Sequence, residues 1–448
     1  MKKKATALKE LLIINSSLLI LASCSLQKQL SKSATQLVLK DSSLTTAHVG
    51  ISIYEPATNK YWFNYQGDHY FVPASNTKIP TCYAAMKYLG DSLIGGLTGE
   101  NDTAIFFLPV ADPSLLHPDF KYQPVITYLK AANKKIYASD LKWKSSALGS
   151  GWAWNDYNEN YMAERSPMPI YGNLIKWVQD NSTDPTSVYS VPEVNWKVDF
   201  NPGATNNFFV RRNLGENVYN LSTGKEKYKE QNVPFVTNGI KSTLELLTDT
   251  LHKTIGVITE KNFQNILLNK ISIIKGIKTQ PTDSLLKLMM HRSDNFFAEQ
   301  TLLMVSNEQL GVMNDEKIID TLLKTDFKDL PQKPRWADGS GLSRYNLFTP
   351  QDFVAIFNKM KNEFGMDRIK NIFPTGGEGT LNNYYRAENG YLFGKTGSLS
   401  GVVALSGFLY TKKNKLLIFS VLVNNHNASA TAVRRAVEKF IEGIRNDY

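Results

Sequence analysis

The chain has 448 residues, of which 42% are hydrophobic and 21% are charged, the usual proportions of a globular protein. This length exceeds that of a typical domain and predicts two or three packed units. The formal net charge of +10 suits an anionic surface such as acidic lipid or cell-wall polymer. No nucleic-acid motif and no basic run with interleaved aromatic residues occurs, so we expect no nucleic-acid binding.

The N-terminal segment is typical of an export signal. A basic start (MKKK) precedes an apolar run over residues 11–22, which is shorter than the roughly 20 residues of a membrane-spanning helix. The run ends Leu-Ala-Ser-Cys, which resembles the lipobox of bacterial lipoproteins, a family in which the cysteine is acylated and becomes the new N-terminus. A buried free thiol is the alternative for Cys24. We predict a signal peptide over 1–23, a lipidated Cys24 with a tether to residue 40, and a lipid anchor that holds the protein to a membrane of the cell envelope, in the periplasm or at the cell surface.

A hairpin and a helix are predicted before residue 95. Apolar and β-branched residues predict strands over 49–54 and 60–65, joined by turn-forming residues. A helix is expected to begin at Ser75 and to end at Gly90. Pro80 cannot donate to the carbonyl of Asn76, so the first turn is expected to be 3₁₀-like. The buried face of this helix is expected to carry Ile79, Cys82, Met86 and Leu89.

The middle of the chain, residues 96–239, is predicted to be one or two inserted domains rich in β-structure. Short strand-like pieces, such as 104–109 and 194–198, alternate there with turn-rich stretches. Helical patterning then returns over residues 242–252, 260–268, 284–291 and 295–305.

Three strands and a closing helix are predicted at the C-terminal end, over residues 391–398, 402–410, 416–424 and 428–445. Together with the N-terminal hairpin they indicate one antiparallel sheet closed by both chain ends. We therefore predict an α/β (α+β) fold in which residues 41–95 and 240–448 form one catalytic domain around the insert.

Several kinds of site are not indicated. The chain has no HExxH, no paired CxxC and no GxSxG, and its six histidines lack the spacing of metal ligands. We expect neither a metal nor a cofactor. The sequence does not predict an oligomeric state.

Ser75-Asn76-Thr77-Lys78 is an SxxK motif, which places a hydroxyl and an amine one helical turn apart. A neutral amine beside a serine can take its proton, so Lys78 is the candidate base for the nucleophile Ser75. Five other SxxK matches occur, at Ser25, Ser139, Ser222, Ser272 and Ser284, and these are chance occurrences. Only Ser75 stands at the start of an amphipathic helix that follows a hairpin.

Two further tripeptides follow in order. Ser293-Asp294-Asn295 is an SxN between two helical segments, and Lys395-Thr396-Gly397 leads into the C-terminal strands. A second cation, Lys395, would lower the pKa of the Lys78 amine and attract a substrate carboxylate. The Thr396 hydroxyl would bind the same carboxylate.

The remaining roles concern the backbone and the SxN residues. Gly397 allows the backbone to approach substrate closely, and the N–H groups of Ser75 and Ser398 would form an oxyanion hole. Ser293 is a candidate proton relay to the leaving amine, and Asn295 would hold the acyl amide. A helix cap is the alternative for Asn295.

SxxK, SxN and KTG in this order match the three-part site of penicillin-binding proteins and serine β-lactamases. The chain resembles the D-Ala-D-Ala carboxypeptidase/endopeptidase branch of the low-molecular-mass penicillin-binding proteins, the class C group. Three more segments carry the resemblance, namely 338–346 (DGSGLSRYN), 112–115 (DPSL) and Gly151-Trp152. The long gap between Ser75 and Ser293 also fits this group, which inserts domains there.

This resemblance implies hydrolysis of D-Ala-linked bonds in peptidoglycan stem peptides through an acyl-Ser75 intermediate, and acylation by β-lactams. It also implies the penicillin-recognising serine transpeptidase/β-lactamase-like fold, an antiparallel sheet flanked by helices with a helical lobe. Carboxypeptidase and endopeptidase activities both stay open. The alternatives are a serine β-lactamase, a non-catalytic wall-binding lipoprotein and an esterase of the same fold.

Overall fold

The computed structural model describes residues 27–182, 187–202, 206–258 and 272–448, which divide into two compact units. Unit 1 comprises the described residues up to Ile79, together with 329–335 and 346–448. Unit 2 comprises 80–328 and 336–345. The predicted signal peptide, Cys24 and the predicted helix over 260–268 lie outside the described residues. Among the described residues, no helix is both long and apolar enough to span a bilayer.

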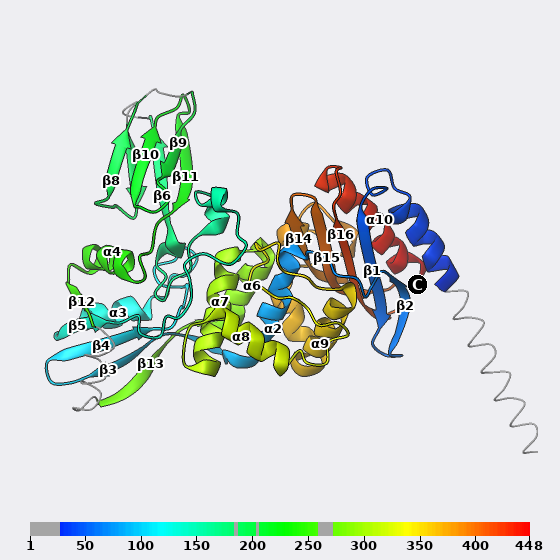
Figure 1. Cartoon of the computed structure of the whole chain (residues 1–448), viewed down its shortest axis with the longest axis horizontal. Coiled ribbons are helices and arrows are strands. Elements are labelled where there is room, and N and C mark those ends of the chain that lie inside the picture. The colour runs from blue at the N-terminus through cyan, green and yellow to red at the C-terminus, as the bar shows by residue number, and fades with distance from the viewer. Residues whose placement is uncertain (1–26, 183–186, 203–205, 259–271) are drawn as a thin grey trace, which may run out of the picture. The chain divides into compact units, whose positions relative to one another are not determined.

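Unit 1 is built on a five-stranded antiparallel sheet with the strand order β14-β15-β16-β1-β2 (Figure 1). Its strands are β1 (His48–Glu55), β2 (Lys60–Tyr65), β14 (Leu392–Leu399), β15 (Val402–Tyr410) and β16 (Leu416–Asn424). β1 pairs with β16, with Ile51 opposite Val421, and so joins the two ends of the chain. The prediction of one antiparallel sheet closed by both chain ends is confirmed.

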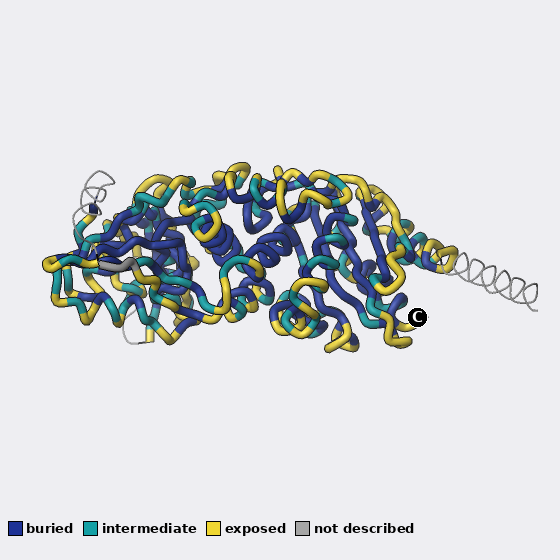
Figure 2. Tube along the Cα trace, turned by 90° about the horizontal axis from the view of Figure 1, so that it is seen from below, coloured by how far each residue is buried: buried dark blue, intermediate teal, exposed yellow. Residues whose placement is uncertain are grey.

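Helices cover both faces of this sheet. The amphipathic helix α10 (Ala430–Asp447) buries Val437 and Phe440 against Val403 on one face. On the other face α9 (Pro350–Ile372) packs the Phe357 ring against Phe408 with 5.0 Å between ring centroids. Side chains alternate along a strand, so β15 supplies apolar residues to both layers. β15 and β16 are accordingly buried along most of their length (Figure 2).

The described residues of unit 2 form three sheets and a group of helices. One sheet has the order β12-β5-β4-β3-β13, and the two smaller sheets have the orders β8-β10-β9 and β11-β6-β7. Its strands are β3 (Ser92–Glu100), β4 (Ala104–Pro109), β5 (Lys135–Ala138), β6 (Leu174–Asp180), β7 (Val188–Val191), β8 (Lys197–Phe200), β9 (Phe209–Arg212), β10 (Val218–Ser222), β11 (Tyr228–Pro234), β12 (Ile255–Val257) and β13 (Ser272–Pro281). Its helices include α3 (Pro124–Ala131), α4 (Lys241–Leu251), α6 (Thr282–Arg292), α7 (Asn295–Leu310) and α8 (Asp315–Lys324).

The predicted elements agree with the structure at most positions, and one strand is wrong. The predicted strand over 194–198 is instead β8, Lys197–Phe200. Val194 and Trp196 lie outside any strand and pack on the apolar core of unit 2, so their alternating pattern reflects burial rather than strand pairing.

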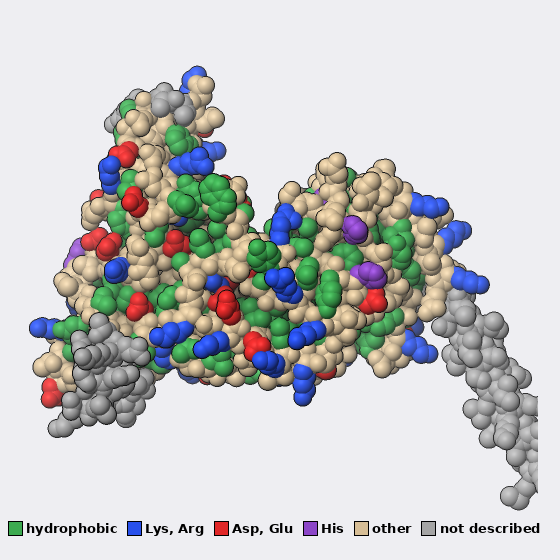
Figure 3. All heavy atoms as spheres, viewed as in Figure 1, with side chains coloured by type: hydrophobic (Ala, Val, Ile, Leu, Met, Phe, Trp, Pro, Cys, Tyr) green, Lys and Arg blue, Asp and Glu red, His purple; other side chains and the backbone are tan. Residues whose placement is uncertain are grey.

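One face of the molecule shows how the charged side chains are distributed. On the face seen in Figure 3, Lys and Arg side chains are spread over the chain with Asp and Glu among them. This distribution indicates no single basic stripe on that face.

Candidate active site

The turn that carries Ser75 is a 3₁₀ helix, η2 (Ala74–Thr77), which continues into α2 (Lys78–Tyr88). The predicted 3₁₀-like first turn is confirmed. The Lys78 Nζ donates a hydrogen bond to the Ser75 Oγ at 3.1 Å. Lys78 is fully buried, whereas Ser75 is partly exposed. An amine and an accessible hydroxyl therefore lie within proton-transfer distance.

The residue before the nucleophile is strained. Ala74 adopts a φ of 47°, a left-handed conformation that costs a residue with a Cβ roughly 1 kcal/mol. Its neighbours hold it in place, since the Ala74 carbonyl accepts a hydrogen bond from the Thr77 hydroxyl at 2.9 Å. Strain of this kind persists only where the surrounding structure over-determines it, and it is concentrated at functional sites.

Lys395 on β14 is the second cation of the cluster. Its side chain is fully buried, and its Nζ donates to the Thr396 carbonyl at 2.7 Å. Burial, together with the charge of nearby Lys78, lowers the pKa of Lys395 well below its usual value. The neutral form of the Lys395 amine is therefore favoured next to the Ser75–Lys78 pair.

Gly397 lets β14 lie against the turn of the nucleophile. A Cβ at this position would come within 2.7 Å of the Pro73 carbonyl oxygen and 3.1 Å of the Ser75 backbone nitrogen. Any side chain would push the strand away from the turn. An oxyanion hole built from the N–H groups of Ser75 and Ser398 would need a close approach of this kind.

The hydroxyls on the opposite side of β14 have partners that the sequence did not indicate. The Thr396 hydroxyl donates to the Thr380 hydroxyl at 2.7 Å. The Ser398 hydroxyl accepts from the guanidinium of Arg434 on α10 at 2.5 Å. Neither Thr380 nor Arg434 belongs to a recognisable motif, so only the folded chain identifies them.

A buried polar chain supports the turn from the sheet side. Asn76, between the nucleophile and the base, donates from Nδ2 to the Ser406 hydroxyl at 2.7 Å. Ser406 in turn lies 2.8 Å from the Ser420 hydroxyl on β16. All three side chains are fully buried. The two central strands of the sheet therefore fix the turn.

Ser293 and Asn295 lie in unit 2, where α6 ends and α7 begins. Ser293 takes a left-handed conformation with a φ of 59° as the C-cap of α6. Asp294 is the N-cap of α7 and accepts from the Phe297 N–H at 2.9 Å, so the cap role considered for Asn295 belongs to Asp294. The Asn295 side-chain amide donates to the Tyr161 carbonyl at 3.0 Å. This bond fixes the amide with its nitrogen towards residue 161.

A buried charge cluster lies further along α7. The Arg165 guanidinium donates to Asp315 Oδ2 at 2.6 Å and lies 3.4 Å from Glu299 Oε2. Burial and the charge of Asp338 raise the pKa of Glu299 to about 7. One guanidinium therefore forms ion pairs with two carboxylates in a buried region.

Asp338 organises the segment 338–346, which was singled out from the sequence. Its carboxylate accepts from the N–H groups of Gly341 at 2.8 Å and Ser343 at 2.7 Å. Trp152 donates its indole N–H to the same carboxylate at 3.0 Å. Two separate sequence landmarks thus meet within unit 2, and their residues have a clear structural role.

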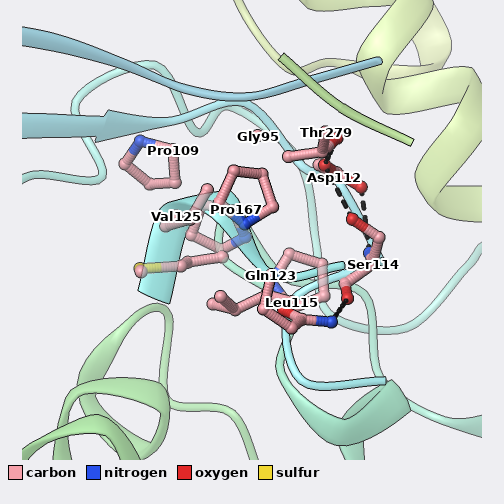
Figure 4. Close-up of a pocket in the computed structure, with 12 residues that line it drawn as sticks. Gly95, Pro109, Asp112, Ser114, Leu115, Gln123, Val125, Pro167 and Thr279 are labelled. Carbon is pink, nitrogen blue, oxygen red and sulfur yellow. Dashed lines mark hydrogen bonds between the residues drawn. The ribbon is translucent and has the colours of Figure 1, made fainter. Parts of the chain in front are cut away.

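The third landmark, Asp112, has a structural environment as well. Figure 4 shows its carboxylate hydrogen-bonded to the hydroxyls of Thr279, at 2.5 Å, and of Ser114, at 3.0 Å. Burial raises the pKa of Asp112 above its usual value. The adjoining cavity measures about 10 Å³, which holds no more than one water molecule. We assign Asp112 to the support of β3 and β13 rather than to ligand binding.

Of the eight residues predicted for the active site, six lie in unit 1, namely Ser75, Lys78, Lys395, Thr396, Gly397 and Ser398. The other two, Ser293 and Asn295, are neighbours at the helix junction in unit 2.

Comparison with known proteins places these features in a family. The family model described as "D-Ala-D-Ala carboxypeptidase 3 (S13) family" matches residues 30–444. The chain is 25% identical to the D-alanyl-D-alanine carboxypeptidase of Actinomadura sp. (strain R39), over 89% of this chain and 82% of the relative.

Solved structures share the fold. The crystal structure of penicillin binding protein 4 (dacB) from Haemophilus influenzae matches with a TM-score of 0.71 and 19% identity, over 93% of this chain and 99% of that one. The same protein in complex with a novel β-lactam matches with a TM-score of 0.68 and 17% identity, over the same shares of the two chains. The predicted fold, an antiparallel sheet with flanking helices and inserted sheet domains, is confirmed.

Proposed function

The chain belongs to the D-Ala-D-Ala carboxypeptidase 3 (S13) family and is a serine hydrolase, and from this premise we propose that it cleaves D-Ala-linked amides of peptidoglycan stem peptides through an acyl-Ser75 intermediate. The observation that carries the proposal is the Lys78 Nζ at 3.1 Å from the Ser75 Oγ. The buried Lys395 amine lies beside that pair.

In the proposed reaction the Ser75 oxygen attacks the carbonyl carbon of the penultimate D-Ala, and its proton passes to neutral Lys78. The N–H groups of Ser75 and Ser398 hold the oxyanion. Collapse of the tetrahedral intermediate breaks the C–N bond, and the leaving amine takes a proton. Water then attacks the acyl-Ser75 ester, which releases the acid and returns the proton to the hydroxyl.

The roles of the other residues are proposed from their chemistry and the family resemblance. Lys395 and Thr396 attract the substrate carboxylate, and Gly397 keeps the strand close to the nucleophile. Ser293 relays the proton to the leaving amine, and Asn295 binds the acyl amide. The resemblance of Ser293-Asp294-Asn295 to the SxN element supports these last two assignments.

The test compares wild type with Ser75→Ala on an uncrosslinked pentapeptide and on a D-Ala-crosslinked muropeptide, with the products identified by mass spectrometry. We expect wild type to release D-Ala or to split the crosslink, and the variant to do neither. Release of D-Ala from the pentapeptide alone would define a carboxypeptidase, and cleavage of the crosslink an endopeptidase. Equal activity of the two proteins would contradict the proposal.

We also propose that β-lactams acylate Ser75. The Haemophilus influenzae relative has been solved in complex with a β-lactam, which supports the proposal. Intact-protein mass spectrometry after exposure to benzylpenicillin should show one added penicillin, located by peptide mapping on the peptide that contains Ser75. An adduct that turns over within seconds would instead indicate a β-lactamase.

The lipid anchor is a further proposal, supported by the Leu-Ala-Ser-Cys sequence after a short apolar run. We propose that Cys24 is acylated and holds the protein to a membrane of the cell envelope. Expression in a bacterial host should give a membrane-bound protein with a lipid-modified N-terminal cysteine, and Cys24→Ser should abolish the modification. An unmodified Cys24 in the membrane fraction would refute the proposal.

A further inference from the structure

The first described residues of the chain form a helix that packs on unit 1. Residues 27–34 are α-helical and continue into the π-helical segment η1 (Thr35–Leu39), and Figure 1 shows this stretch beside α10. Leu30, Ala34 and Val38 are four positions apart, so they lie on one side of the helix, and all three are buried in the same apolar core as α10. The described part of the stretch predicted to be a tether is therefore a helix fixed to unit 1.

The outer side of this helix carries three lysines. Lys28, Lys32 and Lys40 are exposed and border one shallow hollow. The other residues around the hollow are polar and uncharged, namely Gln27, Ser31, Thr35 and Gln36. No carboxylate occurs in the sequence from residue 27 to residue 40, and the next acid, Asp41, accepts from the Ser43 hydroxyl at 2.6 Å. Within the described part of the chain the three ammonium groups form no ion pair, so their positive charge is uncompensated.

The position of the helix in the chain brings its lysines close to the proposed lipid anchor. Only residues 25 and 26 separate Cys24 from Gln27. Three fully extended residues span at most about 11 Å, which is close to the Debye length of about 8 Å at physiological ionic strength. An acylated Cys24 would therefore hold the start of the helix within the distance over which lysines are attracted to an anionic leaflet.

We propose that the outer side of residues 27–40 binds the anionic headgroups of a lipid bilayer through Lys28, Lys32 and Lys40, and so holds unit 1 against the membrane. Positive charge alone attracts any polyanion, and the two-residue distance to Cys24 favours lipid as the partner. In this respect the inference rests on the proposed lipid anchor. An acyl chain and a basic patch are two membrane-binding signals that together give stable attachment.

The experiment uses the mature chain, from residue 24 on, with Cys24→Ser, so that no lipid is attached. Flotation measures its binding to vesicles of phosphatidylcholine alone and of equal parts of phosphatidylcholine and phosphatidylglycerol. We expect binding to the mixed vesicles only, and release at high salt, because salt screens the attraction. Replacement of Lys28, Lys32 and Lys40 together by Gln should lower the partition coefficient about 100-fold, which is about fivefold for each lysine.

The matched control replaces Lys317, Lys324 and Lys328 by Gln, which removes the same charge from exposed positions of unit 2. It should bind like the unsubstituted chain, and thermal unfolding checks that both triple variants are folded. Equal losses in the two triple variants, equal binding to both kinds of vesicle, or binding to soluble polyphosphate but to neither vesicle would overturn the inference. The assay needs no acylation, so its failure is distinct from that of the anchor, which an unmodified Cys24 would show.

Discussion

Two buried clusters of ionisable side chains in this protein differ in the signs of the charges that they combine. Around Ser75, burial and then the charge of a second amine, Lys78, disfavour ionisation of Lys395. Around α7 the cation Arg165 lies between the carboxylates of Glu299 and Asp315. Like charges brought together in a dry site store free energy that a reaction can use, whereas opposite charges satisfy each other and hold elements together. The first cluster is therefore built for chemistry and the second for support.

The strongest test of this contrast is Lys395→Met, which removes one cation but keeps the shape of the side chain. Acylation of Ser75 by penicillin should fall about 10³-fold, as expected when a preorganised charge is removed. Stability should not fall, and a gain of about 1 kcal/mol in the free energy of unfolding is expected, because the variant no longer buries an amine. Acylation kinetics and urea denaturation measure the two effects. A large loss of stability would show that Lys395 is structural.

The corresponding substitution in the second cluster is Arg165→Met, which removes its cation. Removal of the cation leaves Glu299 and Asp315 buried next to each other without a counter-charge, so we expect a loss of about 3 kcal/mol in the free energy of unfolding. Lys324→Met removes one partner of the exposed ion pair with Asp320 and should cost under about 0.5 kcal/mol. Equal, small losses in the two variants would mean that the Arg165 cluster contributes no support.

The pH dependence of stability tests the state of the carboxylates in the second cluster. Burial and Asp338 raise the pKa of Glu299 to about 7 in the folded chain, against about 4.5 when unfolded. Between these values the folded state keeps a proton that the unfolded state has lost, so stability falls as the pH rises from about 4.5 to 7 and is level above. We expect this group to contribute a fall of about 3 kcal/mol.

Glu299→Gln should remove that fall while keeping an acceptor for the Ser340 N–H, which donates to Glu299 Oε1 at 2.7 Å. Glu308→Gln, at an exposed position of α7, is the control and should retain the wild-type slope. Unfolding curves at several pH values measure the effect. A slope in Glu299→Gln equal to that of wild type would rule out Glu299 as the titrating group.

The two clusters also differ in how far the sequence predicts them. Ser75 and Lys78 are one turn apart, and Lys395 to Ser398 are consecutive, so the geometry within each segment follows from local structure. That the two segments meet was predicted from the resemblance to the three-part site. Arg165 and Asp315 are brought together from 150 positions apart, and no short-range pattern marks them. Arg434 reaches Ser398 in the same way, through the packing of α10 on the sheet. Contacts of this kind depend on tertiary structure.

Helix α9 differs from these contacts, because its start has a local sequence signal. Helix α9 begins with a capping box in which Thr349 and Asp352 each accept from the backbone of the other. This Thr-Pro-Gln-Asp sequence with Pro at N1 is a recognisable helix start. Its bend at Gly365, where φ is 75°, interrupts the apolar pattern and hides the full length of the helix.

The smallest effect on acylation is expected for the polar chain of Asn76, Ser406 and Ser420, which holds the turn of the nucleophile on the sheet. Ser406→Ala leaves the buried Asn76 Nδ2 without its acceptor, so the free energy of unfolding should fall by about 1–2 kcal/mol. Acylation should slow by less than about tenfold, because Asn76 positions the turn but does not touch the reacting atoms. Ser420→Ala removes only the far end of the chain and leaves the Asn76 contact intact, so it should cost less on both counts. If Ser406→Ala slowed acylation as much as Lys395→Met, the hydrogen bond to Asn76 would matter as much for the reaction as the Lys395 amine. That result would contradict a purely supporting role for the polar chain.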